Sequence, residues 1–305
     1  MFLSKLISNM AKYSQTKLMR LEINKRIRAL RKLNLATVNE PYLEKQVREL
    51  LNIGYVARPL IVNASRAFRV RINENRELFT NTKELWHPPP QYIKAKGRVN
   101  DVGESVFYYS DSENTAVIEK RPELGDILTV LEAELVNSDK QPLVMVLGIH
   151  EYTAQSNPNY GGTPPQYDVK QKQFTDREGI SKTNPLLQAY LTEEFMRQVG
   201  LGNEHEYKIT IAIAKILMNE PELLNEDGSR AEGIIVDGFA YPSIASNNLG
   251  ANVALRTDSA DRLYKPVAAT VYRVEEKRDE THYTVGKLKW STSIEEDGTI
   301  NWNAS

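Results

Sequence analysis

Two arginines in the sequence stand where ligand binding accounts for them better than packing does. Arg69 lies in AFRVRI, a run of β-forming residues, and a guanidinium turned inward from such a strand is costly unless it is paired. Arg98 follows a glycine in KGRVN, a turn that lets the backbone come close to a ligand. A planar guanidinium can bind two phosphate oxygens at once, so both side chains are suited to a phosphorylated ligand.

Aromatic, acidic and hydroxyl side chains follow at the ends of further predicted elements. Tyr108 and Tyr109 close the segment SVFYYS, Glu119 lies in the segment after it, and Ser243 ends GIIVDGFAYPS. An aromatic face suits a flat, cationic ring. A carboxylate stabilises the positive charge that develops when a bond to a sugar carbon breaks, as in glycoside hydrolysis. Side chains of these types are suited to contact an aromatic cation and to stabilise developing positive charge.

Strands and helices must position these residues. Runs of β-branched and aromatic residues between turn residues predict strands, and N-cap residues with a following proline stop predict helices. We expect strands at 67–72, 105–110, 127–135, 142–149 and 233–243, helices at 40–52, 110–122, 184–200 and 206–219, an antiparallel meander over 266–305, and a long polar loop at 155–183.

The N-terminal segment, residues 1–35, predicts a basic amphipathic helix. It carries nine Lys and Arg against one acid, Glu22. Two interpretations stay open: the helix docks on the body with a solvated charged face, or it is an arm that contacts a partner or phosphates. Its apolar face would consist of Leu18, Leu21, Ile23, Ile27 and Leu30.

Composition excludes several classes of protein. The formal net charge of the 305 residues is −1, so the chain is not basic throughout as many nucleic-acid-binding proteins are. Without cysteine there is no disulfide, thiol nucleophile or thiolate metal site. The four histidines have no metal-ligand spacing, and no dinucleotide, nucleoside-triphosphate or serine-hydrolase motif occurs. The longest apolar run is LVMVLGI, far below the ~20 residues of a membrane span, so we expect a soluble, cytoplasmic protein.

Five short motifs occur in the order of the RES family, and together they resemble that family. They are FRVR, ELWHPPP, GRVN, SVFYYSDSENTAVIE and YPS…NVAL, and the resemblance covers roughly residues 62–265. RES proteins are NAD-consuming toxins of bacterial toxin–antitoxin pairs, and their fold is related to mono-ADP-ribosyltransferases. The resemblance implies an α+β fold with an ADP-ribosyltransferase-like split mixed sheet and surrounding helices. The expected domains are a basic helical segment at 1–60, the RES domain at 61–265 and an antiparallel β extension at 266–305.

Carried over position by position, the resemblance implies a site for NAD as a substrate, without a metal. The catalytic residues would be Glu119, Arg69 and Ser243. The residues that bind NAD would be Arg69, Arg98, Tyr108, Tyr109, Arg71 and Asn100.

Two of these assignments depend on strand geometry. Side chains two residues apart share one face of a strand, so Arg71 is an alternative to Arg69. The same alternation turns only one of Tyr108 and Tyr109 toward the cleft, and we favour Tyr108. Plainer interpretations also stand: Glu119 would be a solvated helix residue, Arg98 would lie in a surface turn, and Ser243 would cap the turn that follows it.

The expected function is cleavage of the nicotinamide–ribose bond of NAD, with ADP-ribose passed to water, phosphate or a macromolecule. The chain would act as a growth-inhibiting toxin with a small helical antitoxin protein as its partner. One alternative is an NAD-binding sensor or interaction module without turnover, which has no need of Glu119. Another is a nucleic-acid-binding protein led by the basic helix, whose binding would depend steeply on salt; nucleic acid is not the expected partner.

Overall fold

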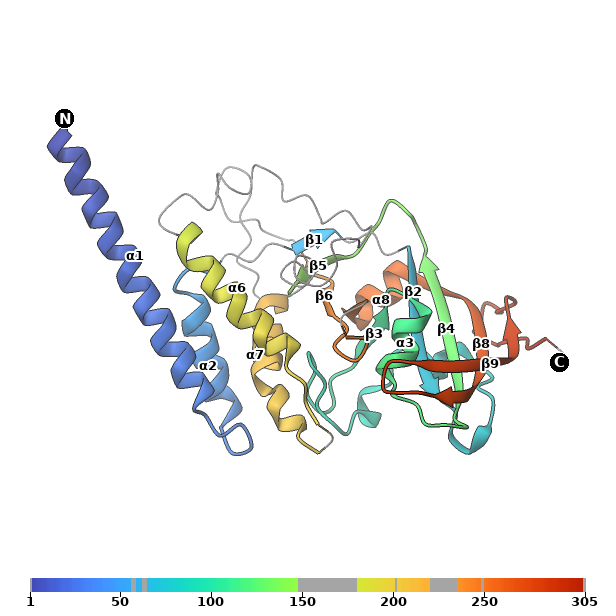
Figure 1. Cartoon of the computed structure of the whole chain (residues 1–305). Coiled ribbons are helices and arrows are strands. Elements are labelled where there is room, and N and C mark those ends of the chain that lie inside the picture. Colours follow the sequence, from blue (N-terminus) through green and yellow to red (C-terminus); the bar gives the residue numbers. More distant parts are fainter. Residues whose placement is uncertain are drawn as a thin grey trace. The chain divides into compact units, whose positions relative to one another are not determined.

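The computed structural model describes residues 2–55, 59–61, 65–147, 180–200, 202–219, 235–247 and 250–303 (Figure 1). Most of the loop expected at 155–183 lies outside the described residues. The chain forms two compact units. The helical unit consists of Met1–Arg58, Lys96–Val99 and His150–Val236, and the sheet unit of Pro59–Ala95, Asn100–Ile149 and Asp237–Ser305.

The described part of the helical unit contains the helices α1 (Phe2–Arg31), α2 (Glu40–Leu51), α6 (Ile180–Met196) and α7 (Lys208–Asn219). The sequence predicts each of them. At the start of α2 the side chain of Asn39 accepts a hydrogen bond from the backbone N–H of Tyr42 (3.1 Å), with Pro41 in the first turn. A capping side chain followed by proline is a strong start signal, which is why this boundary is predicted correctly.

The apolar face of α1 is narrower than expected. Ile23, Ile27 and Leu30 are buried, whereas Leu18 and Leu21 are 64% and 54% exposed. The spacing of four and three residues keeps the buried three on one side of the helix, and the two leucines fall out of that phase. The expectation that Leu18 and Leu21 belong to the buried face is wrong.

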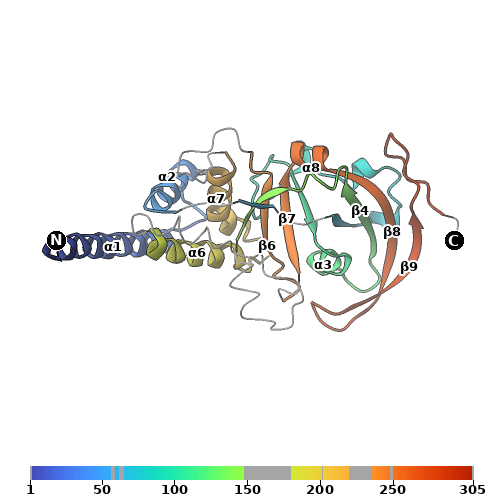
Figure 2. The ribbon, with the colours of Figure 1, turned by 90° about the horizontal axis from the view of Figure 1, so that it is seen from above.

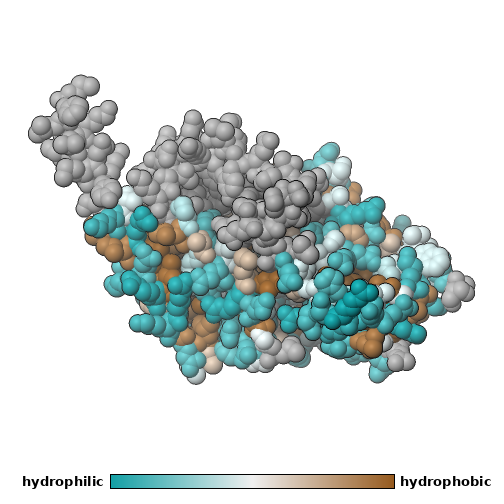
Figure 3. Space-filling view, in the orientation of Figure 1, coloured by the Kyte–Doolittle hydropathy of each residue, from teal (hydrophilic) through white to brown (hydrophobic). Residues whose placement is uncertain are grey.

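Several basic residues of α1 form ion pairs inside the helical unit. Arg26 pairs with Glu22 (2.9 Å) and Glu49 (2.6 Å), and Arg31 pairs with Glu193. Together with the buried isoleucines, these contacts favour the interpretation that α1 docks on the helices beside it. On the face shown in Figure 3 the described surface is mostly hydrophilic, with small hydrophobic patches.

The described strands form one mixed sheet with the order β1-β5-β6-β7-β3-β2-β4-β8-β9. Strands β5 and β6 are parallel, and the other neighbouring pairs are antiparallel. With the helices this makes an α+β fold, as expected. The strands are β1 (Pro59–Ile61), β2 (Arg66–Ile72), β3 (Val106–Ser110), β4 (Ile127–Leu135), β5 (Leu143–Val146), β6 (Gly238–Pro242), β7 (Ala251–Arg256), β8 (Tyr264–Lys277) and β9 (Tyr283–Ser291).

The two faces of the sheet are covered by different short helices (Figure 2). Helix α3 (Glu113–Glu119) packs with Val70 and Val130 on one face. Helix α8 (Thr257–Leu263) packs with Phe107 and Tyr109 on the other. The sequence predicts α3, although it ends sooner than expected because Arg121 takes a left-handed conformation (φ 46°) just beyond it. Strand β7 and helix α8 are not predicted.

The domain division also differs from the expectation. Strands β8 and β9 extend the same sheet, because β8 pairs with β4 along nearly the whole length of β4. The antiparallel tail expected at 266–305 is therefore present, but it is compact with the rest of the sheet unit. None of the described helices combines the length and apolar character that crossing a membrane requires.

Candidate functional site

A cavity of about 240 Å³ lies in the sheet unit beside α3. Strands β2 and β3 pair only at Phe68 and Ser110, so the sheet opens along the rest of the two strands. The cavity is lined by Phe68, Arg69, Val70, Tyr108, Tyr109, Ser110, Ala116, Glu119, Lys120, Tyr241 and Asn252. Four of the residues predicted for the site, namely Arg69, Tyr108, Tyr109 and Glu119, therefore lie around one cavity.

A hydrogen-bond network fixes the carboxylate of Glu119. Its Oε1 accepts hydrogen bonds from Ser243 Oγ (2.6 Å) and Asn252 Nδ2 (2.6 Å). The amide of Asn252 is itself oriented, because its Oδ1 accepts a hydrogen bond from Ser110 Oγ (2.7 Å). Within the described part of the chain Glu119 Oε2 accepts no hydrogen bond. One carboxylate oxygen is thus anchored by hydrogen bonds, and the other is not.

Glu119 reaches this position because α3 docks closely on the loop before β7. Ser112 caps the helix by accepting a hydrogen bond from the N–H of Thr115 (3.2 Å). A Cβ atom on Gly250 would lie 2.1 Å from the hydroxyl of Thr115, so only glycine permits this approach. The same loop holds Ser243, whose N–H donates to the carbonyl of Gly250 (2.8 Å).

Ser243 is completely buried and does not line the cavity. Its Oγ donates to Glu119 and also accepts a hydrogen bond from the N–H of Ser246 (3.2 Å). The plainer interpretation is therefore confirmed, because Ser243 caps the turn that follows it, and its hydroxyl also holds Glu119. Its catalytic role stays a prediction. In geometry Ser243 is a positioning residue rather than one that touches a ligand.

Arg69 lies at the opening between the two strands. Its Nη1 donates to the backbone carbonyl of Tyr108 (2.8 Å), and its guanidinium lies 5.7 Å from the centre of the Phe107 ring. The Nε atom is buried and has no hydrogen-bond partner among the described residues. Burial, and then the positive charge of Arg71, lowers the pKa of Arg69 to about 10. A buried donor without a partner is costly.

The two tyrosines differ in what they offer the cavity. Tyr109 is buried, its ring packs against Phe107 and Tyr264, and its hydroxyl lies 3.1 Å from that of Tyr264. Burial and the neighbouring Tyr264 raise the pKa of Tyr109. Tyr108 is half-buried, and its hydroxyl donates to Oδ1 of the buried Asn100 (2.8 Å). Asn100 therefore orients Tyr108, and Tyr108 keeps an accessible surface.

Lys120 follows Glu119 at the end of α3 and also lines the cavity. The residue is exposed, and partial desolvation beside the cavity lowers its pKa to about 8. The positive charges of Arg69 and Arg71 add to this effect, and Glu119 opposes it. Lys120 is therefore a further basic residue at the cavity, and the sequence analysis does not identify it.

Arg71 and Arg98 make other contacts. The Arg71 guanidinium donates to the carbonyl of Glu84 (2.6 Å) and lies 5.3 Å from the centre of the Phe79 ring. Arg98 belongs to the helical unit. Its guanidinium donates to the backbone carbonyls of Phe195 and Arg197 and lies 5.2 Å from the centre of the Tyr207 ring. Their roles in NAD binding stay predictions.

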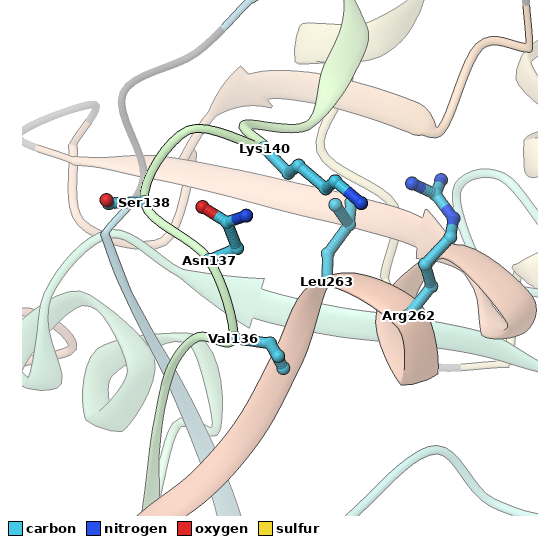
Figure 4. Close-up of a pocket in the computed structure, with 6 residues that line it drawn as sticks. All are labelled: Val136, Asn137, Ser138, Lys140, Arg262 and Leu263. Carbon is cyan, nitrogen blue, oxygen red and sulfur yellow. The ribbon is translucent and has the colours of Figure 1, made fainter.

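A second, more open cavity of about 540 Å³ lies in the sheet unit (Figure 4). It is lined by Val136, Asn137, Ser138, Lys140, Arg262 and Leu263. Arg262 is paired with the buried Asp237 (2.6 Å), whose carboxylate also accepts from Ser259 Oγ (2.7 Å) and the N–H of Leu143 (2.8 Å). These contacts join α8 to the start of β5, so we assign Arg262 a structural role.

Sequence reasoning missed two residues that shape the site. Asn252 stands in the motif YPS…NVAL, but its role depends on an amide orientation that only the fold shows. Lys120 stands beside Glu119, where an isolated sequence favours a solvated helix end. Among the described residues no group of three or more His, Asp or Glu is placed to hold a metal ion. Comparison of the sequence with protein-family models and with curated proteins gives no match in either case.

Substituting Ser243 with alanine tests how Glu119 is held. On the NAD cleavage that we propose below, kcat should fall about tenfold with KM unchanged, because one hydrogen bond that orients the carboxylate is lost while the cavity lining stays the same. The matched control is Ser246→Ala, which removes a hydrogen bond to the carbonyl of Ser243 in the same turn but none to Glu119. Steady-state kinetics on NAD would contradict this role if both variants lowered kcat equally.

Proposed function

We propose that the chain is an enzyme that cleaves NAD at the bond between nicotinamide and ribose. The observation that carries the proposal is the Glu119 carboxylate, which is anchored through one oxygen and open through the other, in a cavity that also holds Arg69 and Tyr108. The resemblance to the RES family supports it. So does the opening between β2 and β3, since an ADP-ribosyltransferase-like fold is expected to have a split sheet.

Each residue would have a defined part in the reaction. As the bond from the ribose C1′ to the nicotinamide nitrogen breaks, its electron pair leaves with nicotinamide and positive charge develops at C1′. Glu119 stabilises that charge and accepts a hydrogen bond from a ribose hydroxyl through Oε2. The acceptor then attacks C1′; when the acceptor is water or a hydroxyl, it loses a proton in forming the new bond. Nicotinamide, initially a flat cationic ring, would lie on the exposed face of Tyr108.

The cavity volume supports a placement of one half of NAD inside it. Pockets for whole drug-sized ligands have volumes of about 300–1,000 Å³, and this cavity has about 240 Å³. We therefore place the nicotinamide–ribose half inside, with the first phosphate near Arg69. The adenosine half would lie outside the cavity.

Growth and NAD content of a bacterial host test the proposal in a cell. Expression of the chain should lower cellular NAD and slow growth, as for a cytoplasmic toxin with a small helical antitoxin as its partner. Expression of Glu119→Gln at the same level should do neither. Slow growth with unchanged NAD in both strains would contradict the proposal.

The remaining alternative is a nucleotide sensor that binds NAD without turning it over. Arg69 and Tyr108 would serve either function, and Glu119 separates them. A sensor would bind NAD with similar affinity in the wild type and in Glu119→Gln, and it would release no nicotinamide in either.

A further inference from the structure

The charged residues around the cavity do not balance. Two cations, Arg69 and Lys120, line it together with one carboxylate, Glu119. The carboxylate already accepts two hydrogen bonds through Oε1, while Arg69 keeps a buried Nε without a partner among the described residues. The charged side chains that line the cavity therefore sum to a net positive charge, which suits an anionic ligand.

We propose that Lys120 makes the cavity select phosphorylated ligands, by binding the phosphate attached to the nicotinamide ribose. Glu119 and Lys120 line the same cavity, so a ribose held by the carboxylate can place its 5′-phosphate within reach of the lysine. Arg69 would bind the same phosphate from β2. The inference rests on the proposed function, because it takes a nicotinamide nucleotide as the ligand.

The charges that face Lys120 make its binding of phosphate depend on pH. Arg69 and Arg71 on β2 disfavour its ammonium form, and Glu119 on α3 favours it. Only the protonated amine attracts phosphate, and its pKa in the free protein is about 8. The contribution of Lys120 should be complete below about pH 7 and decrease as the pH rises through 8, by up to tenfold per pH unit. The pKa of Arg69, about 10, keeps that group largely charged up to pH 9.

The test compares two ligands that differ by a single phosphate, nicotinamide mononucleotide and nicotinamide riboside. Calorimetry on the full chain gives the ratio of their dissociation constants, and the ratio of kcat/KM replaces it for any ligand that is turned over. We expect Lys120→Met to lower the preference for the phosphorylated ligand roughly 10- to 100-fold. Lys120→Arg should keep the preference and make it independent of pH between 7.5 and 9. Lys140→Met, which removes an exposed lysine at the second cavity, is the matched control.

An unchanged preference in Lys120→Met, or equal weakening of both ligands, would overturn the inference while NAD cleavage could still stand. A preference that depends on Lys120, in a protein that leaves NAD intact, would support the inference and contradict the proposed enzyme. Binding of neither ligand by the folded wild type would contradict both.

Discussion

Replacing Glu119 with glutamine is expected to lower kcat on NAD about 100-fold or more, equivalent to ~2.7 kcal/mol of lost transition-state stabilisation. The glutamine side chain has nearly the same shape, and its Oε1 can still accept the hydrogen bonds from Ser243 and Asn252. The variant therefore loses the negative charge and little else. Since that charge matters most as positive charge appears at the ribose, KM should change less than threefold.

Two comparisons make this result specific. Glu113→Gln removes a carboxylate from the first turn of the same helix, away from the cavity lining, and should leave kcat within twofold. Thermal unfolding of Glu119→Gln should match that of the wild type. If Glu119→Gln raised KM and left kcat unchanged, the carboxylate would be a binding group and the placement of ribose beside it would be wrong.

Replacing Arg69 with methionine is expected to weaken NAD binding roughly 30- to 150-fold, since one charge-assisted contact with phosphate is lost. A guanidinium on phosphate touches the substrate and the transition state alike, so the loss should appear in KM and leave kcat nearly unchanged. Arg69→Lys should restore only part of the affinity, because an ammonium group cannot bind two oxygens in the same way. Steady-state kinetics on the three proteins measures both effects.

Replacing the other two arginines of β2 with methionine shows whether the loss of NAD binding is specific to Arg69. Arg66→Met removes an exposed arginine that pairs with Glu132 and should leave KM within twofold. Arg71→Met decides between the two candidate arginines, and the observed contacts of Arg71 with Glu84 and Phe79 favour Arg69 as the ligand-binding residue. A larger rise of KM in Arg71→Met than in Arg69→Met would reverse that assignment.

Local sequence signals predict most of the elements that carry the site. Strand β2 and helix α2 lie within one residue of the expected bounds, because alternation, capping and proline act over a few residues. The end of α3 is predicted less well, since the left-handed residue that stops it is Arg121 rather than a glycine. The prediction of the buried face of α1 is wrong at Leu18 and Leu21, because an apolar residue need not lie on the side of the helix that is buried.

The site itself depends on long-range contacts that periodicity does not encode. Ser243 and Glu119 are 124 positions apart in the chain, and their hydrogen bond exists because α3 docks at Gly250. The expectation that both residues share one site comes from the resemblance to the RES family, because their spacing in the sequence does not imply it. Arg98 shows the same limit, because its glycine-flanked turn does not reveal that its guanidinium contacts two backbone carbonyls and an aromatic ring.

The most direct test of the central claim is the release of nicotinamide from NAD by the purified full-length chain. Chromatography of timed samples, with water alone and with added phosphate, measures nicotinamide formed and NAD lost. The account predicts one nicotinamide for each NAD consumed, and a rate at least 100-fold lower in Glu119→Gln. Intact NAD under both conditions in the presence of the folded wild-type protein, or equal release by the wild type and the variant, would contradict it.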